Sequence, residues 1–91
     1  MQIVGPITNG QVSAGLTAVQ LSATSFPLMN GIRVKSIATN TGKVYFGGLG
    51  VTASNGYQLV PGSSEHIVAT DVNTIYVIAD TAAQTVCFVG G

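Results

Sequence analysis

A glycine-rich stretch in the middle of the chain has the residue pattern of a dinucleotide-binding turn. Residues 46–56 read FGGLGVTASNG, in which Gly48, Gly50 and Ala53 give the spacing G-x-G-x-x-A. An apolar run precedes the stretch, and Asp71 lies 21 positions after Gly50, where such a fold holds an acidic residue for the ribose. In that chemistry the glycines let the backbone approach the pyrophosphate, which rests on the N-terminus of the next helix.

The helix that this chemistry needs is missing from the sequence. A helix starting at Gly50 would meet Asn55-Gly56 after little more than one turn, and then a strand-like run that ends at Pro61. Helix nucleation is costly, so a helix of one turn that ends at Asn-Gly does not form. We therefore interpret the stretch as a connection between strands, in which glycine allows positive φ and close backbone approach. No cofactor is expected.

The other patterns that could carry catalysis or bind a metal are incomplete. His66 and Cys87 are the single histidine and the single cysteine, and the acidic residues are Glu65, Asp71 and Asp80. A metal site needs three or four converging ligands. A serine hydrolase with a Ser-His-Asp arrangement needs a nucleophile turn, and nothing in the sequence resembles one. We expect His66 to be a strand side chain with an ordinary hydrogen bond, and we expect no metal and no enzymatic activity.

Charged residues are unusually rare and make up 7% of the chain, against about 25% in a typical soluble domain. Three basic residues, Arg33, Lys35 and Lys43, balance the three acidic ones. They are too few to follow a nucleic-acid backbone, and no apolar run approaches the ~20 residues of a membrane-spanning helix. These counts predict neither a nucleic-acid nor a membrane partner. The neutral exterior is either simply polar or covered by neighbours in an assembly, and we favour the assembly.

Strand-like runs with turn residues between them recur at intervals of about 8–14 residues, which is typical of an antiparallel sandwich or barrel. The runs lie at residues 16–23, 32–39, 44–47, 57–60, 64–70, 74–79 and 84–89. They predict an all-β fold, a small antiparallel β-sandwich or jelly-roll-like barrel of about seven or eight short strands. We expect residues 16–91 to form this single domain and residues 1–15 to form an extended N-terminal arm. Residues 40–43 are expected to be a tight turn that joins 32–39 and 44–47 in a hairpin.

Several apolar residues are candidates for contact with a partner. The run Ile75-Tyr76-Val77-Ile78 is apolar on both faces of a strand, so it either lies under a long loop or presents one face to another subunit. The arm could pair with the sheet edge of a neighbour by strand addition. The residues expected to contact a partner are Ile3, Val4 and Ile7 in the arm, Tyr57 beside the glycine stretch, and Tyr76 and Ile78.

Residues 40–62 read NTGKVYFGGLGVTASNGYQLVPG, and an acidic turn at 71–73 and the run IYVIA at 75–79 follow. This pattern resembles small β-sandwich virion proteins of tailed bacteriophages, which decorate heads or form parts of fibres and tails. The resemblance covers about residues 32–89 and excludes the arm. It implies a non-enzymatic role on the capsid exterior after synthesis in the host cytoplasm. It also implies a homo-oligomer, commonly a trimer, that binds the major capsid protein.

Two alternatives stay open at this point. The protein could belong to another part of the virion, such as the tail, the neck or a fibre. It could instead be a carbohydrate- or host-surface-binding module that uses Tyr57 and the loop beside it.

Overall fold

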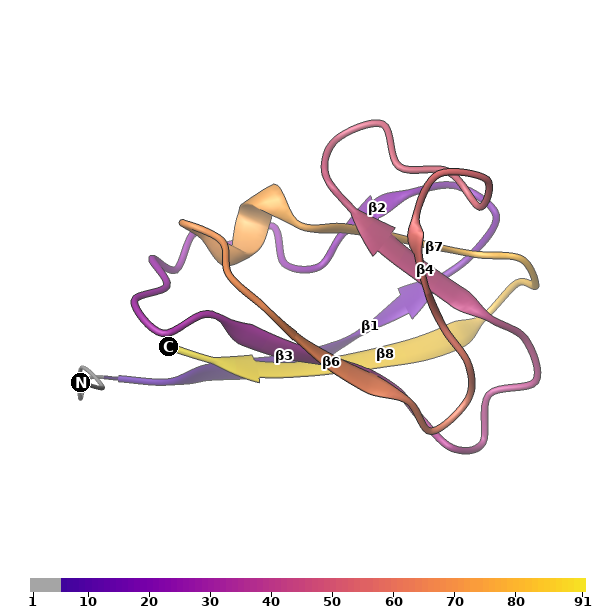
Figure 1. The fold of residues 1–91 in the computed structure, drawn as a ribbon, viewed down its shortest axis with the longest axis horizontal. Helices are drawn as coiled ribbons and strands as arrows, with labels where there is room; N and C mark the ends of the chain where they lie inside the picture. Colours follow the sequence, from indigo (N-terminus) through magenta and orange to yellow (C-terminus); the bar gives the residue numbers. More distant parts are fainter. Residues whose placement is uncertain (1–5) are drawn as a thin grey trace.

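The computed structural model describes residues 6–91, which fold into two antiparallel sheets of four strands each (Figure 1). Sheet A has the order β1-β8-β3-β6 and sheet B the order β2-β7-β4-β5. The predicted all-β sandwich is therefore confirmed. The elements are β1 (Thr8–Ala14), β2 (Val19–Gln20), β3 (Ile32–Ser36), β4 (Val44–Gly47), β5 (Tyr57–Leu59), β6 (Ser64–Ile67), the 3₁₀ turn η1 (Val72–Thr74), β7 (Tyr76–Ala79) and β8 (Gln84–Gly90).

The first four strands pair with the last four in reverse order. β1 pairs with β8, β2 with β7, β3 with β6, and β4 with β5, all antiparallel. The chain is thus one long two-stranded ribbon with the β4–β5 connection at its tip. Rolling this ribbon adds the pairs β3–β8 and β4–β7, which complete the two sheets. The result is the strand arrangement of an eight-stranded jelly roll.

The core lies between the two sheets and consists mainly of branched aliphatic side chains. In β3, residues alternate between buried and exposed, with Ile32 and Val34 inward and Arg33 and Lys35 outward. Branched side chains suit this position because they pack well on a pleated surface. Burial of each stabilises the fold by roughly 1.5–3 kcal/mol. The buried hydrophobic residues of the core are Ala14, Leu21, Ile32, Val34, Val44, Phe46, Leu59, Val72, Ile75, Val77, Ala79, Val86 and Phe88.

The predicted hairpin between residues 32–39 and 44–47 is wrong. β3 lies in sheet A and β4 in sheet B, so residues 37–43 cross from one sheet to the other. The Asn40 side chain accepts from Thr85 N at 2.9 Å, and Gln84 Oε1, the side-chain amide oxygen, accepts from Thr41 N at 2.8 Å. Asn and Gly mark a turn correctly, but these long-range bonds determine which strands the turn connects.

The predicted N-terminal arm is also wrong for Thr8–Ala14. This segment is β1, and each of its seven residues is paired with β8. Asn-Gly is a common turn pair, but Gly10 lies within β1 and has a packing role, because a Cβ there would lie 3.0 Å from the ring of Phe88. Ile3 and Val4, which are expected to contact a partner, lie outside the described residues.

A buried charge in β7 tests the assignment of the core. Val77 is fully buried, whereas Val89 in β8 is 46% exposed on the outer face of sheet A. An unpaired charge in a core costs several kcal/mol, comparable with the total stability of a small domain, about 5–10 kcal/mol. We expect Val77→Asp to abolish cooperative thermal unfolding monitored by circular dichroism. Val89→Asp is the matched control and should keep it, and a Val77→Asp protein that still melts cooperatively would contradict the assignment.

Candidate functional site

One end of the sandwich is formed by the chain ends and by the three loops that follow even-numbered strands. These segments are residues 6–7, 21–31, 48–56, 68–75 and 90–91, and we call them the apolar end. Antiparallel pairing places alternate connections toward the same end of each sheet. In Figure 1 the C-terminus and residues 21–31 and 68–75 lie at the left, and residues 48–56 extend from the end of β4 over the top of sheet B. Four large hydrophobic side chains of the apolar end are 66–86% exposed: Ile7, Met29, Leu49 and Val68.

Backbone contacts connect three of these exposed residues to one another. The Gly91 carbonyl oxygen accepts from Met29 N at 2.9 Å, and Gly91 packs beside Ile7. One residue before Met29, Leu28 N donates to the carbonyl oxygen of Thr70 at 3.0 Å. Ile7, Met29 and the loop that contains Val68 therefore lie next to one another.

The glycine-rich loop is the β4–β5 connection at the tip of the ribbon, so its interpretation as a link between strands is confirmed. Residues 48–51 form a turn in which Val51 N donates to Gly48 O at 3.2 Å and Gly50 has a φ of 88°. This is the geometry of a type II turn, which needs glycine at its third position. A second turn follows, in which Asn55 Oδ1 accepts from Thr52 N at 2.7 Å. The loop is therefore held by its own hydrogen bonds.

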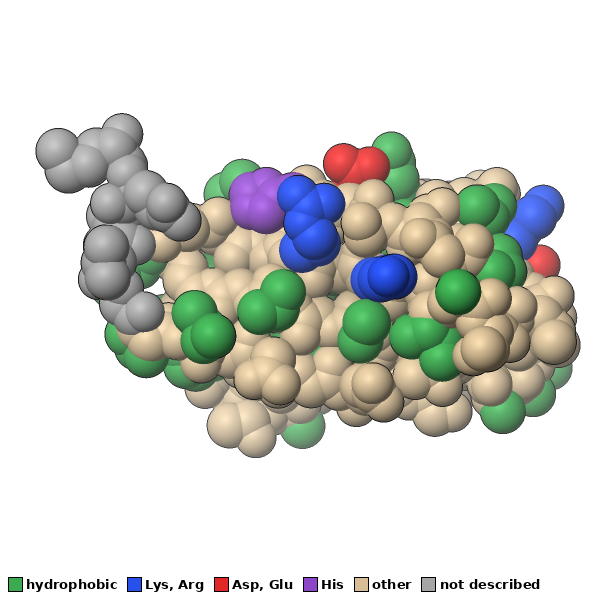
Figure 2. Space-filling view, turned by 90° about the horizontal axis from the view of Figure 1, so that it is seen from below, with side chains coloured by type: hydrophobic (Ala, Val, Ile, Leu, Met, Phe, Trp, Pro, Cys, Tyr) green, Lys and Arg blue, Asp and Glu red, His purple; other side chains and the backbone are tan. Residues whose placement is uncertain are grey.

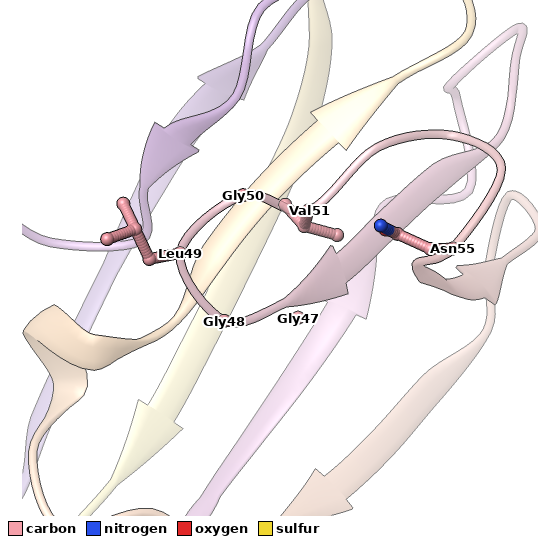
Figure 3. A pocket seen from close by; sticks show the side chains of 6 residues that line it. All are labelled: Gly47, Gly48, Leu49, Gly50, Val51 and Asn55. Carbon is pink, nitrogen blue, oxygen red and sulfur yellow. The ribbon is translucent and has the colours of Figure 1, made fainter.

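Val51 fixes this loop to the outer face of sheet B. Its side chain is buried, and a Cβ at either Gly47 or Gly56 would lie 2.9 Å from Val51 Cγ2. Figure 3 shows Val51 and Asn55 pointing toward each other, while Leu49 points the opposite way. The hydrogen bonds and Val51 thus hold Leu49, which is 85% exposed, in one place.

Asp71 holds the other two loops of the apolar end together. Its carboxylate accepts hydrogen bonds from the Ser25 hydroxyl, from Asn73 N at 3.0 Å and from Phe26 N at 2.9 Å. These donors, Ser25 first, hold the pKa of Asp71 below its ordinary value. Asp71 thereby caps η1 and connects residues 21–31 with residues 68–75.

A shallow hollow of about 230 Å³ lies between the glycine-rich loop and the segment after β6. Val68 lies on its wall, and Gly47 and Gly48 belong both to this hollow and to a second one of about 340 Å³ that includes Leu49. The first hollow is lined by Phe46, Gly47, Gly48, Ile67, Val68, Ala69, Thr74 and Ile75. Its walls are mostly apolar and carry no titratable side chain, so they suit contact with another surface.

Charge is nearly absent from the apolar end and lies elsewhere. Asp71 is the one charged residue in its five segments. The opposite end holds Lys43 and Asp80, whose carboxylate accepts from Lys43 N at 3.0 Å. Arg33 and Lys35 lie on the outer face of sheet A, and Figure 2 shows blue side chains over the middle of this face. An exposed apolar surface held by several fixed loops is typical of a protein–protein contact.

Of the predicted contact residues, the four within residues 6–91 lie on three separate surfaces. Ile7 belongs to the apolar end. Tyr76 and Ile78 are half-buried on the outer face of sheet B, in a row of residues that includes Gly47, against which Val51 packs. Tyr57 lies on β5, against Phe46, with ring centroids 5.2 Å apart.

Tyr57 and Glu65 connect the two sheets at their β5–β6 side. The Tyr57 hydroxyl donates to Glu65 Oε2 at 3.2 Å, and this contact raises the pKa of the tyrosine. Glu65 lies opposite Val34 and so faces the gap between the sheets. The expectation for His66 is confirmed, because its Nε2 lies 2.9 Å from the carbonyl oxygen of Asn30 on the strand's outer side.

Sequence reasoning missed Met29, Leu49 and Val68. The signal for Leu49 was present, since a single large apolar residue between glycines has no strand partner to bury it. Val68 was assigned to a strand that in fact ends at Ile67. Met29 carried no signal, because its exposure depends on the long-range bond to Gly91.

The described residues contain no group of three His, Cys, Asp or Glu side chains that could hold a metal ion. None of the helical turns in residues 6–91 is long and apolar enough to span a membrane. Comparison with protein-family models, with curated proteins and with solved structures found no match to this chain.

The pKa of Asp71 gives a test of how the apolar end is held. Because the folded pKa lies below the unfolded value of about 3.9, the stabilisation is complete above that value and is lost as the pH falls through the folded pKa. We expect Asp71→Asn to lower the melting temperature at pH 7, and the difference from wild type to shrink below pH 4 or so. Ser25→Ala, which removes one donor, should lower it less. A difference of equal size at pH 7 and pH 2 would contradict this role.

Proposed function

We propose that the protein is a non-enzymatic structural protein of a phage virion, which decorates or cements the capsid by binding between subunits of the major capsid protein. The observation that carries the proposal is the apolar end, where Leu49, Val68, Met29 and Ile7 are exposed on segments held by hydrogen bonds. A surface fixed before binding loses little conformational entropy on contact, which favours a stable structural interface.

The composition and the fold support the same role. A cementing protein acts through buried area and shape, so it has no need of charge, and only 7% of these residues are charged. Jelly rolls occur in viral capsid proteins, but also in lectins, and a shared fold is an analogy that does not define function. The exposed hydrophobic residues of the apolar end are therefore the main support for the proposal.

The proposal includes a homo-oligomer on the capsid exterior, made in the host cytoplasm, with no nucleic-acid or membrane partner. Only the resemblance to virion proteins supports a trimer. The apolar end provides the surface for the major capsid protein, and a different surface is then needed for contact between copies.

Binding to capsids tests the proposal directly. Val68→Asp places a charge on the apolar end, where Val68 is 86% exposed, and Val60→Asp places the same charge at the opposite end. Both valines lie outside the core, so both variants should fold. We expect Val68→Asp to lose co-sedimentation with expanded capsids of the phage that encodes the protein, and Val60→Asp to retain it. Wild-type protein that fails to co-sediment, or equal binding by the two variants, would contradict the proposal.

The alternative within the class of virion structural proteins is a position on the tail, the neck or a fibre. The apolar end suits contact with any of these assemblies, because its chemistry is not specific to a capsid. Electron microscopy of virions labelled with an antibody to the protein distinguishes head from tail.

A carbohydrate-binding module is the alternative from another class, and the 56% exposure of Tyr57 favours it. An aromatic ring on a surface can stack on a sugar, but the hydroxyl of Tyr57 already donates to Glu65. If this alternative holds, Tyr57→Ala should abolish binding on a glycan array, whereas Tyr45→Ala, on the other face of sheet B, should not. No binding by wild type would dismiss it.

A further inference from the structure

The four edge strands of the sandwich differ sharply in length and charge. β2, β5 and β6 have two, three and four residues. β6 also carries Glu65 and His66, and Pro61 follows β5 closely. Short strands, charges and proline are the usual devices that prevent one sheet edge from pairing with another. Three of the four edges are therefore protected.

β1 has none of these protections. It is seven residues long, it reads TNGQVSA, and it contains no charge and no proline. Within residues 6–91 it pairs with β8 alone, so alternate residues direct their N–H and C=O groups away from the sheet. Figure 2 shows no blue or red on the half of sheet A toward β1, whereas the charges lie over its middle and its β6 side.

The strand is suited to pairing with a second copy of itself. In an antiparallel pair related by a two-fold axis, the register that uses all seven residues sets Thr8 opposite Ala14 of the other copy. Gln11 then lies opposite its own equivalent, and Asn9 lies opposite Ser13. These three side chains are exposed on one face and neutral, so no like charges meet.

The residues at the two ends of β1 fit the same register. Ile7 is 70% exposed and Leu16 is 67% exposed, one before the strand and one after it. Continuing the register brings Ile7 of one copy opposite Gly15 of the other, next to Leu16. A Cβ at Gly15 would meet no atom of the described residues within 4 Å, so space is open there. The two-fold axis repeats this apolar contact at both ends of the strand pair.

We infer that β1 is the contact between two copies of this chain, which join their A sheets into one sheet of eight strands. The Arg33 and Lys35 side chains lie on β3, two strands away from the contact. The β3 strands of the two copies are then about 24 Å apart, well beyond the screening length of about 8 Å at physiological ionic strength. Pairing through β6 would instead set Glu65 or His66 opposite its own equivalent, which disfavours that edge.

This inference is independent of the virion role, and it predicts a different number of copies from the resemblance. A two-fold contact uses the same surface on both partners and closes after two. The apolar loops at 48–56 and 68–75 lie on other segments, so the pair would still present Leu49 and Val68 to a larger assembly. Of the apolar end, only Ile7 would be covered by the second copy.

The test is the mass of the purified protein in solution, measured by light scattering over a range of concentrations. Wild type should have twice the mass of one chain. Gln11→Lys sets two lysines opposite each other and should raise the dissociation constant about tenfold or more. Gln58→Lys is the matched control, because Gln58 is an exposed glutamine on the β5 edge, and it should leave the dimer unchanged.

A mixture of Gln11→Lys and Gln11→Glu proteins should restore the dimer as mixed pairs, which native mass spectrometry identifies. Circular dichroism checks that each variant is folded, as expected for an exposed position. A monomeric or trimeric wild type, or a Gln11→Lys protein that dimerises as tightly as Gln58→Lys, would overturn the inference. Capsid binding is measured separately, so failure here does not decide the proposed function.

Discussion

Backbone hydrogen bonds between the first and second halves of the chain are the constraint on which the structure depends. The strands β1 to β4 pair in reverse order with the strands β5 to β8. The pair closest in sequence is β4 and β5, and only the glycine-rich loop lies between them. Because the ribbon then rolls, valines from both halves meet in one core. The same arrangement gathers three loops and both chain ends at one end of the sandwich.

That grouping explains how residues far apart in the sequence come to form the apolar end. The exposed hydrophobic residues of the apolar end come from positions scattered over the sequence, from Ile7 to Val68. Each is held by contacts that belong to the fold, such as the Asp71 carboxylate or the Val51 side chain. The scarce charges lie mainly on β3 and at the opposite end, so they neither assist nor oppose contact at the apolar end.

The local features of this chain were readable from its sequence, and the long-range ones were not. Period-two alternation in Ile32–Ser36 identified a strand, and the missing helix after Gly50 correctly predicted a connection between strands there. The assignment of β3 and β4 to different sheets depends on bonds such as that of Asn40 to Thr85, 45 residues apart. The pairing of β1 with β8 is long-range in the same way, since the aromatic ring that packs against Gly10 belongs to Phe88. Met29 was missed because its exposure depends on the long-range bond to Gly91.

The position of β8 has a consequence for synthesis in the cell. Of the eight strands it leaves the ribosome last, yet it lies inside sheet A between β1 and β3. Until it emerges, both of those strands lack their shared neighbour, and a nascent chain exposes two extra strand edges in place of one continuous sheet. Folding that waits for distant partners is slow and leaves chains open to wrong association. The yield of native protein would then depend on how long these edges stay exposed during synthesis, as well as on final stability.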